Sequence, residues 1–244
     1  MDKAEVLDIG FDIVDLENAV KAVTNMALSG EPHVVITANP EFVYSLHHTP
    51  RLRELLDRAD MVVADGSGVV IASKLLGCPL PERVPGVDLV EGVLNTGQVS
   101  EVYLLGGKPG VAVEAGRNLQ GRFPHVHLVG THHGYFGIEE EATLIAEIAG
   151  SGAQLLLVGM GAPKQEMWLL EHKHELKVPV MIGVGGSLDV FAGRVKRAPG
   201  WAQRSHLEWL YRMVSEPKRF YRLPRLLWFA EQVLTSKITK SARS

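Results

Sequence analysis

Short apolar runs rich in β-branched residues recur along the chain. A run without polar alternation is typical of a strand buried on both faces of a parallel sheet. The runs lie at residues 33–38, 61–64, 101–107, 126–129, 153–158 and 178–182. The segments between them, with apolar residues at helical spacing, lie at 16–28, 41–47, 50–59, 69–76, 87–94, 111–120 and 139–149. This alternation predicts βαβ units and a Rossmann-like α/β fold, with a mostly parallel sheet covered by helices on both faces.

The two ends of the chain depart from this pattern. Residues 5–15 predict a short hairpin or edge pair of strands with a turn near Gly10. Pro199 interrupts the chain, and residues 201–213 and 218–234 then resemble basic, aromatic helices. We therefore expect an α/β domain at residues 1–194 and a helical appendage at residues 195–244.

Charge divides the chain at the same place. Residues 1–193 contain 13 Lys and Arg against 25 Asp and Glu, whereas residues 194–244 contain 12 against 3. The overall charge of −3 conceals this split. A basic tail on an acidic body is typical of a segment that meets an anionic surface.

Composition narrows the class of protein. With 244 residues, of which 46% are hydrophobic, the chain can bury a full core. The single cysteine, Cys78, argues against a disulfide framework and fits a reducing cytoplasm. We expect no signal peptide and no transmembrane span, because no apolar run approaches the roughly 18 residues that a span needs. We therefore expect a cytoplasmic protein that is soluble or peripheral rather than integral.

Asp65 is the first candidate catalytic residue. It follows the strand at 61–64 and precedes Gly66-Ser67-Gly68, so it lies at a strand's carboxyl end, where open α/β sheets bind ligands. Arg83, before a Pro-Gly turn, is placed to face the same crevice. Thr37 and Asn39 offer a hydroxyl and an amide at the end of the neighbouring run. The alternative is that Asp65 caps a helix and Arg83 is a surface charge.

Two glycine-rich loops suggest a nucleotide ligand. The first carries Gly161 and Lys164, and the second carries Gly185, Gly186 and Asp189. Each follows a strand and opens a helix, where backbone N–H groups can hold phosphate and Asp189 can accept from ribose hydroxyls. Neither loop has the G-x-G-x-x-G spacing and the chain has no Walker A sequence, which disfavours a dinucleotide enzyme. Ordinary strand-to-helix turns are the alternative.

The sequence predicts no metal and no cofactor. Most of the ten histidines form close pairs without the i,i+4 spacing of helical ligands, and we interpret them as solvated, except that His132 or His133 can line the ligand loop. The chain has no D-x-D pattern, which often holds a divalent ion on a sugar nucleotide. Arginines of the tail are then the expected source of positive charge for a leaving diphosphate.

The tail itself has three interpretations. Arginines and aromatic residues alternate in it, which suits a nucleic-acid arm or a membrane surface. Residues 223–234 are too apolar for a typical nucleic-acid arm, so we expect an anionic membrane surface and no nucleic acid as partner. Plain packing against the main domain is the third interpretation.

Eight motifs together resemble the WecG/TagA/CpsF glycosyltransferases. They are T-A-N-P-E (37–41), A-D-G-S-G (64–68), E-R-V-P-G-V-D (82–88), G-A-P-K-Q-E-M-W (161–168), G-V-G-G-S-L-D-V-F-A-G (183–193), R-A-P-x-W (197–201), L-E-W-L-Y-R (207–212) and E-P-K-R-F (216–220). The motifs run in order over nearly the whole chain.

The resemblance implies an inverting, metal-independent enzyme at the cytoplasmic membrane. Members of the family move N-acetylmannosamine or a related sugar from a UDP donor onto an undecaprenyl-diphosphate-linked sugar. TagA-like members make the linkage unit of wall teichoic acid, and WecG-like members build enterobacterial common antigen. A UDP-glucose or UDP-uronic-acid donor is the alternative within the family. A non-catalytic nucleotide-binding module on the membrane is the alternative outside it, and self-association into a homo-oligomer stays open.

The resemblance also assigns roles to residues. Asp65 is the expected base, and Arg83 is expected to meet a diphosphate. Thr37, Asn39 and Gln165 are expected to line the two sugars. The expected contacts to uracil, ribose and phosphate come from Tyr135, Phe136, Gly161, Lys164, Gly185, Gly186, Asp189, Arg212, Arg219 and Arg222.

Overall fold

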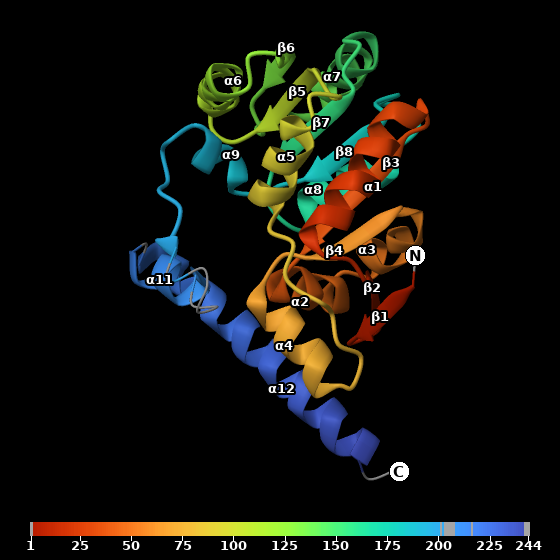
Figure 1. Ribbon diagram of the computed structural model, residues 1–244, viewed down its shortest axis with the longest axis vertical. Helices are drawn as coiled ribbons and strands as arrows, with labels where there is room; N and C mark the ends of the chain where they lie inside the picture. The colour runs from red at the N-terminus through yellow and green to blue at the C-terminus, as the bar shows by residue number, and fades with distance from the viewer. Residues whose placement is uncertain (1, 201, 203–207, 216, 242–244) are drawn as a thin grey trace.

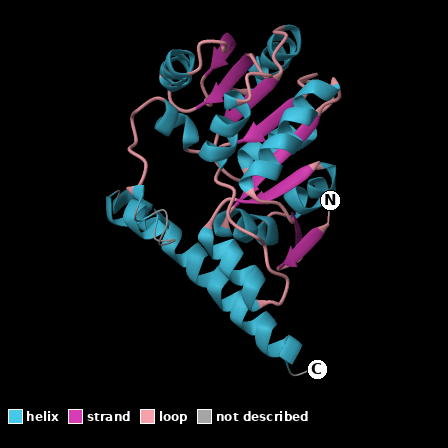
Figure 2. Ribbon diagram, in the orientation of Figure 1, coloured by secondary structure: helices cyan, strands magenta, loops and turns pink. Residues whose placement is uncertain are grey.

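A six-stranded parallel sheet forms the centre of the protein, in a computed structural model that describes residues 2–200, 202, 208–215 and 217–241. In the order of the sheet, the strands are β4 (Met61–Ala64), β3 (His33–Ala38), β8 (Val180–Gly183), β7 (Leu155–Gly159), β5 (Glu101–Gly106) and β6 (His127–His132). Neighbouring strands pair in parallel throughout. The Rossmann-like α/β prediction is confirmed (Figure 2).

Helices cover both faces of the sheet because each central strand is apolar on both sides. In β7, Leu155 and Leu157 belong to one buried cluster, and Leu156 and Val158 belong to the other. The first face is covered by α1 (Leu16–Ser29), α5 (Gly86–Asn95), α6 (Val111–Arg122) and α9 (Ser187–Phe191). The second is covered by α2 (Pro40–His48), α3 (Pro50–Leu55) with η1 (Leu56–Arg58), α4 (Ser67–Leu75), α7 (Ile138–Gly150) and α8 (Lys164–Glu171).

The N-terminal hairpin consists of β1 (Lys3–Val6) and β2 (Ile9–Asp12), paired antiparallel. Its turn is at Leu7 and Asp8, which have φ angles of 50° and 62°, so the predicted turn near Gly10 is wrong. Gly10 lies inside β2, opposite Glu5. Two consecutive residues with positive φ form the tight turn that suits a twisted hairpin, and here neither of them is glycine.

The order of the strands creates a crevice between β5 and β7. The chain leaves β5 toward β6 on one side, and leaves β7 toward β8 on the other. Ligands bind at such a switch point, outside the carboxyl ends of the strands, because the two diverging connections leave space between them.

The C-terminal segment lies diagonally below the sheet (Figure 1). It contains α11 (Glu208–Ser215), η2 (Pro217–Arg222) and α12 (Leu223–Ser241). Phe229 and Val233 of α12 are buried in the same core cluster as residues of α2 and α4, and the Trp228 ring lies edge-on to Tyr44 at 5.2 Å. One face of α12 therefore packs on the α/β body, while the division at residue 194 stays a prediction.

In the part of the chain that the structure describes, no helix is long and apolar enough to cross a bilayer.

Candidate active site

Asp65 lies at the carboxyl edge of the sheet, directly after β4. Its backbone N–H donates to the Ala38 carbonyl at 2.9 Å, which aligns it with the end of β3. The Val84 N–H donates to the Ala64 carbonyl at 2.8 Å, so the loop that carries Arg83 runs beside the end of β4. The structure thus brings the backbone segments of Asp65 and Arg83 together, while the predicted orientation of the Arg83 guanidinium toward Asp65 stays a prediction.

The glycines around Asp65 allow two loops to approach closely. A Cβ atom on Gly68 would lie 2.8 Å from Cγ of Pro40, and one on Gly66 would lie 3.4 Å from Cδ of the same proline. Real Cβ atoms do not approach a ring carbon at 2.8 Å, so residue 68 must be glycine in this backbone. The Asn39-Pro40 turn and the Asp65 loop therefore depend on each other for their shape.

Thr37 and Asn39 each use part of their side chain to build the site. Thr37 is 8% exposed, and its Oγ1 donates to the Gly183 carbonyl at 2.8 Å. The Asn39 Oδ1 accepts from the N–H groups of Glu41 and Phe42, both at 3.0 Å, and so caps α2. A contact from Asn39 to a sugar would therefore come from its Nδ2 amide, because the side-chain oxygen is engaged.

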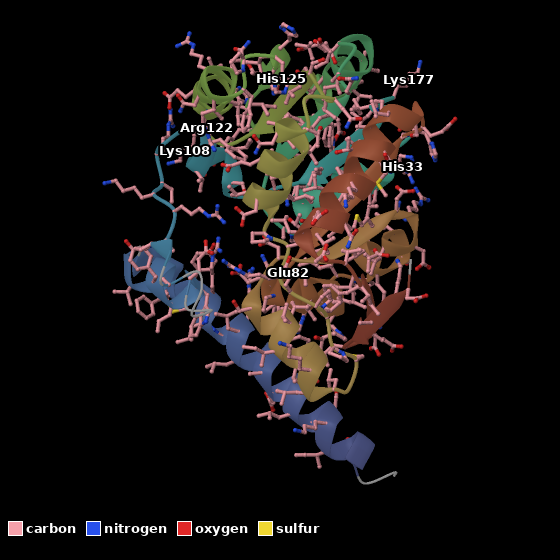
Figure 3. All side chains as sticks on the ribbon, viewed as in Figure 1. His33, Glu82, Lys108, Arg122, His125 and Lys177 are labelled. Carbon is pink, nitrogen blue, oxygen red and sulfur yellow. The ribbon has the colours of Figure 1, made fainter. Side chains whose placement is uncertain are left out.

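Arg83 reaches the C-terminal segment. Its Nη1 donates to Oε2 of Glu208 on α11 at 2.8 Å, and the two side chains are only 16% and 14% exposed. Next to it, Glu82 Oε1 accepts from the Leu16 N–H at 2.8 Å, which holds the loop against the start of α1 (Figure 3). The guanidinium is therefore fixed by a carboxylate 125 residues later in the chain.

Two adjoining cavities occupy the crevice at β5 and β7. The first, of about 470 Å³, is lined by Gly107, Gly134, Tyr135, Phe136, Gly159, Met160 and Lys164. The second, of about 410 Å³, is lined by Gly107, Lys108, Tyr135, Gly159, Gly161, Gly185, Gly186, Asp189 and Arg194. Each residue of the glycine loops and of the Tyr135-Phe136 loop that was predicted to contact uracil, ribose or phosphate lines one of these cavities, whereas Arg83 lines neither.

Aromatic and basic side chains meet at the first cavity. The Nζ atom of Lys164 lies 5.2 Å from the centre of the Phe136 ring, and Phe136 lies edge-on to Trp168 at 6.0 Å. Tyr135 is 67% exposed at the mouth. A flat aromatic surface beside an ammonium group suits a ligand that combines a base with phosphates.

Gln165 connects the two glycine loops. Its Oε1 accepts from the N–H of Gly161 at 3.1 Å and from the N–H of Gly185 at 3.0 Å. Two of the N–H groups expected to face a phosphate thus donate to Gln165 instead. Gln165 also lies beside Gly183, whose carbonyl accepts from Thr37, and so stands between the cavities and the Asp65 side of the edge.

Glu166 is a buried acid that sequence reasoning missed. It is 2% exposed, its Oε1 accepts from Gln165 Nε2 at 2.7 Å, and its Oε2 has no hydrogen-bond partner among the described residues. Burial raises the pKa of the Glu166 carboxyl to about 7, although the hydrogen bond from Gln165 acts in the opposite direction. Its place in G-A-P-K-Q-E-M-W was visible, but nothing in the sequence showed its burial.

We expect Glu166→Gln to change how stability depends on pH. Because the folded-state pKa is raised from 4.5 to about 7, the folded protein holds this proton more tightly than the unfolded chain. The contribution to stability is complete below about pH 4.5 and is lost as the pH rises to about 7, up to roughly 3 kcal/mol in total. Urea unfolding at pH 5 and pH 8 should show that the variant gains stability relative to the wild type at the higher pH. Equal differences at both pH values would contradict the prediction.

Of the three tail arginines predicted to bind substrate, the structure describes the side chain of Arg222 only. Arg222 Nη1 lies 3.1 Å from Glu41 Oε1, close in sequence to Asn39 and Pro40. The side chains of Arg212 and Arg219 lie outside the described part of the structure. Sequence reasoning also missed the pairings of Arg83 with Glu208 and of Arg197 with Asp88. These residues lie inside the quoted motifs, but nothing in the local sequence shows contacts between such distant parts of the chain.

The histidines only partly match the interpretation as solvated residues. The His47 ring lies 5.2 Å from Trp228 and its Nε2 contacts the Leu7 carbonyl at 3.1 Å, so this histidine packs between the hairpin and α12. His132 and His133 lie against each other at 4.5 Å, and neither is among the residues that line the cavities. Among the described residues, no group of three His, Cys, Asp or Glu is arranged to hold a metal ion.

Comparison with known proteins gives the family of this chain. The profile of the glycosyl transferase WecG/TagA/CpsF family matches residues 4–243. Similar relatives occur in the Staphylococcus aureus strains MW2, NCTC 8325 / PS 47 and COL, each named N-acetylglucosaminyldiphosphoundecaprenol N-acetyl-beta-D-mannosaminyltransferase. Each is 37% identical to this chain over 240 residues, which cover 96% of the chain and 93% of the relative. The chain belongs to the WecG/TagA/CpsF family of glycosyl transferases.

Proposed function

We propose that this glycosyl transferase moves N-acetylmannosamine from a UDP donor onto undecaprenyl-diphosphate-linked N-acetylglucosamine, in the synthesis of a cell-wall or surface polysaccharide. The near-full-length similarity to the S. aureus enzymes supports the choice of sugar and acceptor. The observation that carries the chemistry is Asp65 at the same sheet edge as two cavities of a size that suits a nucleotide.

In this proposal the two substrates bind at different parts of the carboxyl edge of the sheet. The cavities at the ends of β5 to β8 suit the UDP-sugar, and Thr37, Asn39 and Asp65 at the ends of β3 and β4 suit the acceptor sugar. Neighbouring strands are about 4.8 Å apart, so the ends of β4 and β7, three spacings apart, lie roughly 14 Å from each other. That separation accommodates a sugar residue from each substrate, with Gln165 between them.

The reaction needs one base and several cations. Asp65 takes the proton of the acceptor hydroxyl, whose oxygen attacks the anomeric carbon of the donor sugar from the face opposite UDP. The bond from that carbon to the UDP oxygen breaks, and UDP leaves with the electron pair. Lys164 and Lys108 line the donor cavities and are placed to stabilise the charge that develops on the leaving diphosphate. Arg83 lies on the acceptor side, in the loop beside the end of β4.

We expect the reaction to survive a chelator. The sequence has no D-x-D pattern, and arginine and lysine side chains surround the site. We compare initial rates of UDP release with and without excess EDTA. The two rates should agree within roughly twofold. Loss of turnover in EDTA that is reversed by excess Mg²⁺ or Mn²⁺ would reveal a metal requirement.

The outer face of the C-terminal segment supports peripheral contact with the membrane. Leu227, Leu234 and Ile238 of α12 are 61%, 55% and 70% exposed, and their spacing places them on one face of the helix. Phe220 and Tyr221 extend this exposed set into η2. An apolar stripe on a basic segment binds to an anionic bilayer surface by burying the stripe among the headgroups. A lipid-linked acceptor would reach the site from that surface.

A panel of donors tests the proposal. Purified protein is given UDP-N-acetylmannosamine, UDP-glucose or a UDP-uronic acid with a lipid-diphosphate-N-acetylglucosamine analogue, and UDP release and product mass are measured. We expect UDP-N-acetylmannosamine to react fastest. Faster transfer from either other donor would change the donor assignment. No UDP release from any donor would favour a non-catalytic binding module.

A further inference from the structure

Glu166 is a buried acid next to Gln165, the residue that connects the two glycine loops. Its carboxyl group is 2% exposed, and its described hydrogen-bond partner is the amide of Gln165 rather than a cation. A buried carboxyl group with an unsatisfied oxygen destabilises a fold, and an apolar residue of the same volume would pack there at lower cost. Such a group persists where a function requires it.

The function follows from the hydrogen bonds of Gln165. Its carbonyl oxygen accepts from Gly161 and Gly185, one from each glycine loop, and its amide nitrogen donates to Glu166 Oε1. Reversing the amide would place N–H groups against N–H groups at both glycines, and oxygen against oxygen at Glu166. The Glu166 oxygen accepts whether or not the carboxyl carries a proton on Oε2, so Glu166 fixes one orientation of the amide.

The two loops held in this way line the donor cavity. Gly161 and Gly185 both line the cavity that also contains Asp189, and both have positive φ angles, 83° and 51°. Because glycine has access to many backbone conformations, these loops depend on their hydrogen bonds to keep one shape. Gly183 also requires this packing, since a Cβ atom there would lie 2.9 Å from Gln165 Nε2.

The geometry points to Glu166 as a positioning residue for nucleotide binding, which acts through the Gln165 amide to hold the loops at Gly161 and Gly185. The inference deepens the proposed function, on which it rests, and assigns to Glu166 a role in donor affinity rather than in proton transfer.

Three variants and their combination test this role. Glu166→Leu removes the acceptor, Glu166→Gln keeps an oxygen that can accept from Gln165, and Gln165→Ala removes the amide. We expect Glu166→Leu to weaken UDP binding, measured by calorimetry, roughly tenfold and to raise the KM for the donor similarly, with the KM for the acceptor unchanged. We expect Glu166→Gln to stay within about threefold of the wild type, because it preserves the hydrogen bond.

The double variant separates positioning from simple packing. If Glu166 acts through Gln165, Glu166→Leu has no further effect on UDP affinity once Gln165 is alanine. The inference would be overturned if the losses of UDP affinity in the two single variants multiplied in the double variant. It would also be overturned if Glu166→Leu bound UDP within twofold of the wild type. A loss in Glu166→Gln as large as that in Glu166→Leu would overturn it as well. A wild type that binds UDP but transfers no sugar would instead overturn the proposed function, because the binding measurement does not depend on transfer.

Discussion

Replacing Asp65 by asparagine is expected to reduce kcat by about 10²–10⁴-fold, the usual loss when a general base is removed. Asparagine has nearly the same shape but cannot take a proton from the acceptor hydroxyl. Asp65 is held at the sheet edge by its backbone, through the N–H bond to Ala38 and the close packing of the adjacent glycines on Pro40. We therefore expect the fold and the affinity for UDP to change little.

The matched control is Asp57→Asn. Asp57 is exposed on η1, which precedes β4 and so lies at the opposite edge of the sheet from Asp65. The same chemical change there should leave kcat within roughly twofold of the wild type, as is usual for surface positions. Steady-state rates, thermal unfolding and UDP calorimetry on both variants check the prediction. An Asp65→Asn enzyme that keeps more than half of the wild-type kcat would exclude Asp65 as the base.

Deleting the chain from Ala198 onward is expected to abolish membrane association and most catalysis, while the α/β body stays folded. The sheet and both helical layers precede residue 198, which is why we expect folding. The deletion removes Glu208, which holds Arg83, and Arg222, which pairs with Glu41. It also removes Phe229 and Val233 from the core, so the melting temperature should fall.

Single substitutions separate anchoring from catalysis. In liposome sedimentation, Arg212→Ala, Arg219→Ala and Arg222→Ala should each show a small loss, because attraction to anionic lipid is roughly 1 kcal/mol per cation and is shared by many. Turnover should fall steeply for the arginine that meets the diphosphate. Lys237→Ala is the control, since Lys237 is an exposed cation of α12 that makes no described ion pair. If the truncated and full-length chains transferred sugar to a soluble acceptor at equal rates, the tail would serve only to anchor the protein to the membrane.

Strands and helices were predictable from the sequence where a local pattern of apolar residues marks them. The apolar runs at residues 33–38 and 61–64 match β3 and β4 residue for residue. The predicted end of β6 was wrong, because the strand continues to His132 through polar residues that no apolar run marks. The hairpin turn was misplaced because Leu7 and Asp8 adopt a backbone conformation that glycine usually supplies.

The site was predictable only as two separate groups of residues. Motifs located Asp65 and the glycine loops, but the order of the strands, which places the cavities between β5 and β7, has no signal in local sequence. The contact between Arg83 and Glu208 likewise depends on how the C-terminal segment lies on the body. The assignments of individual residues to substrates remain predictions.

The parallel sheet also determines where this enzyme can vary. Hydrogen bonds fix the spacing of its strands at about 4.8 Å, so the sheet holds the proposed acceptor and donor sites at a fixed separation. A substitution inside a strand disturbs the core before it changes that separation. Changes of donor preference must therefore accumulate in the loops after β5, β6, β7 and β8, where an insertion can reshape a sugar pocket without moving the base. Relatives that use other sugars should differ from this chain mainly in those loops.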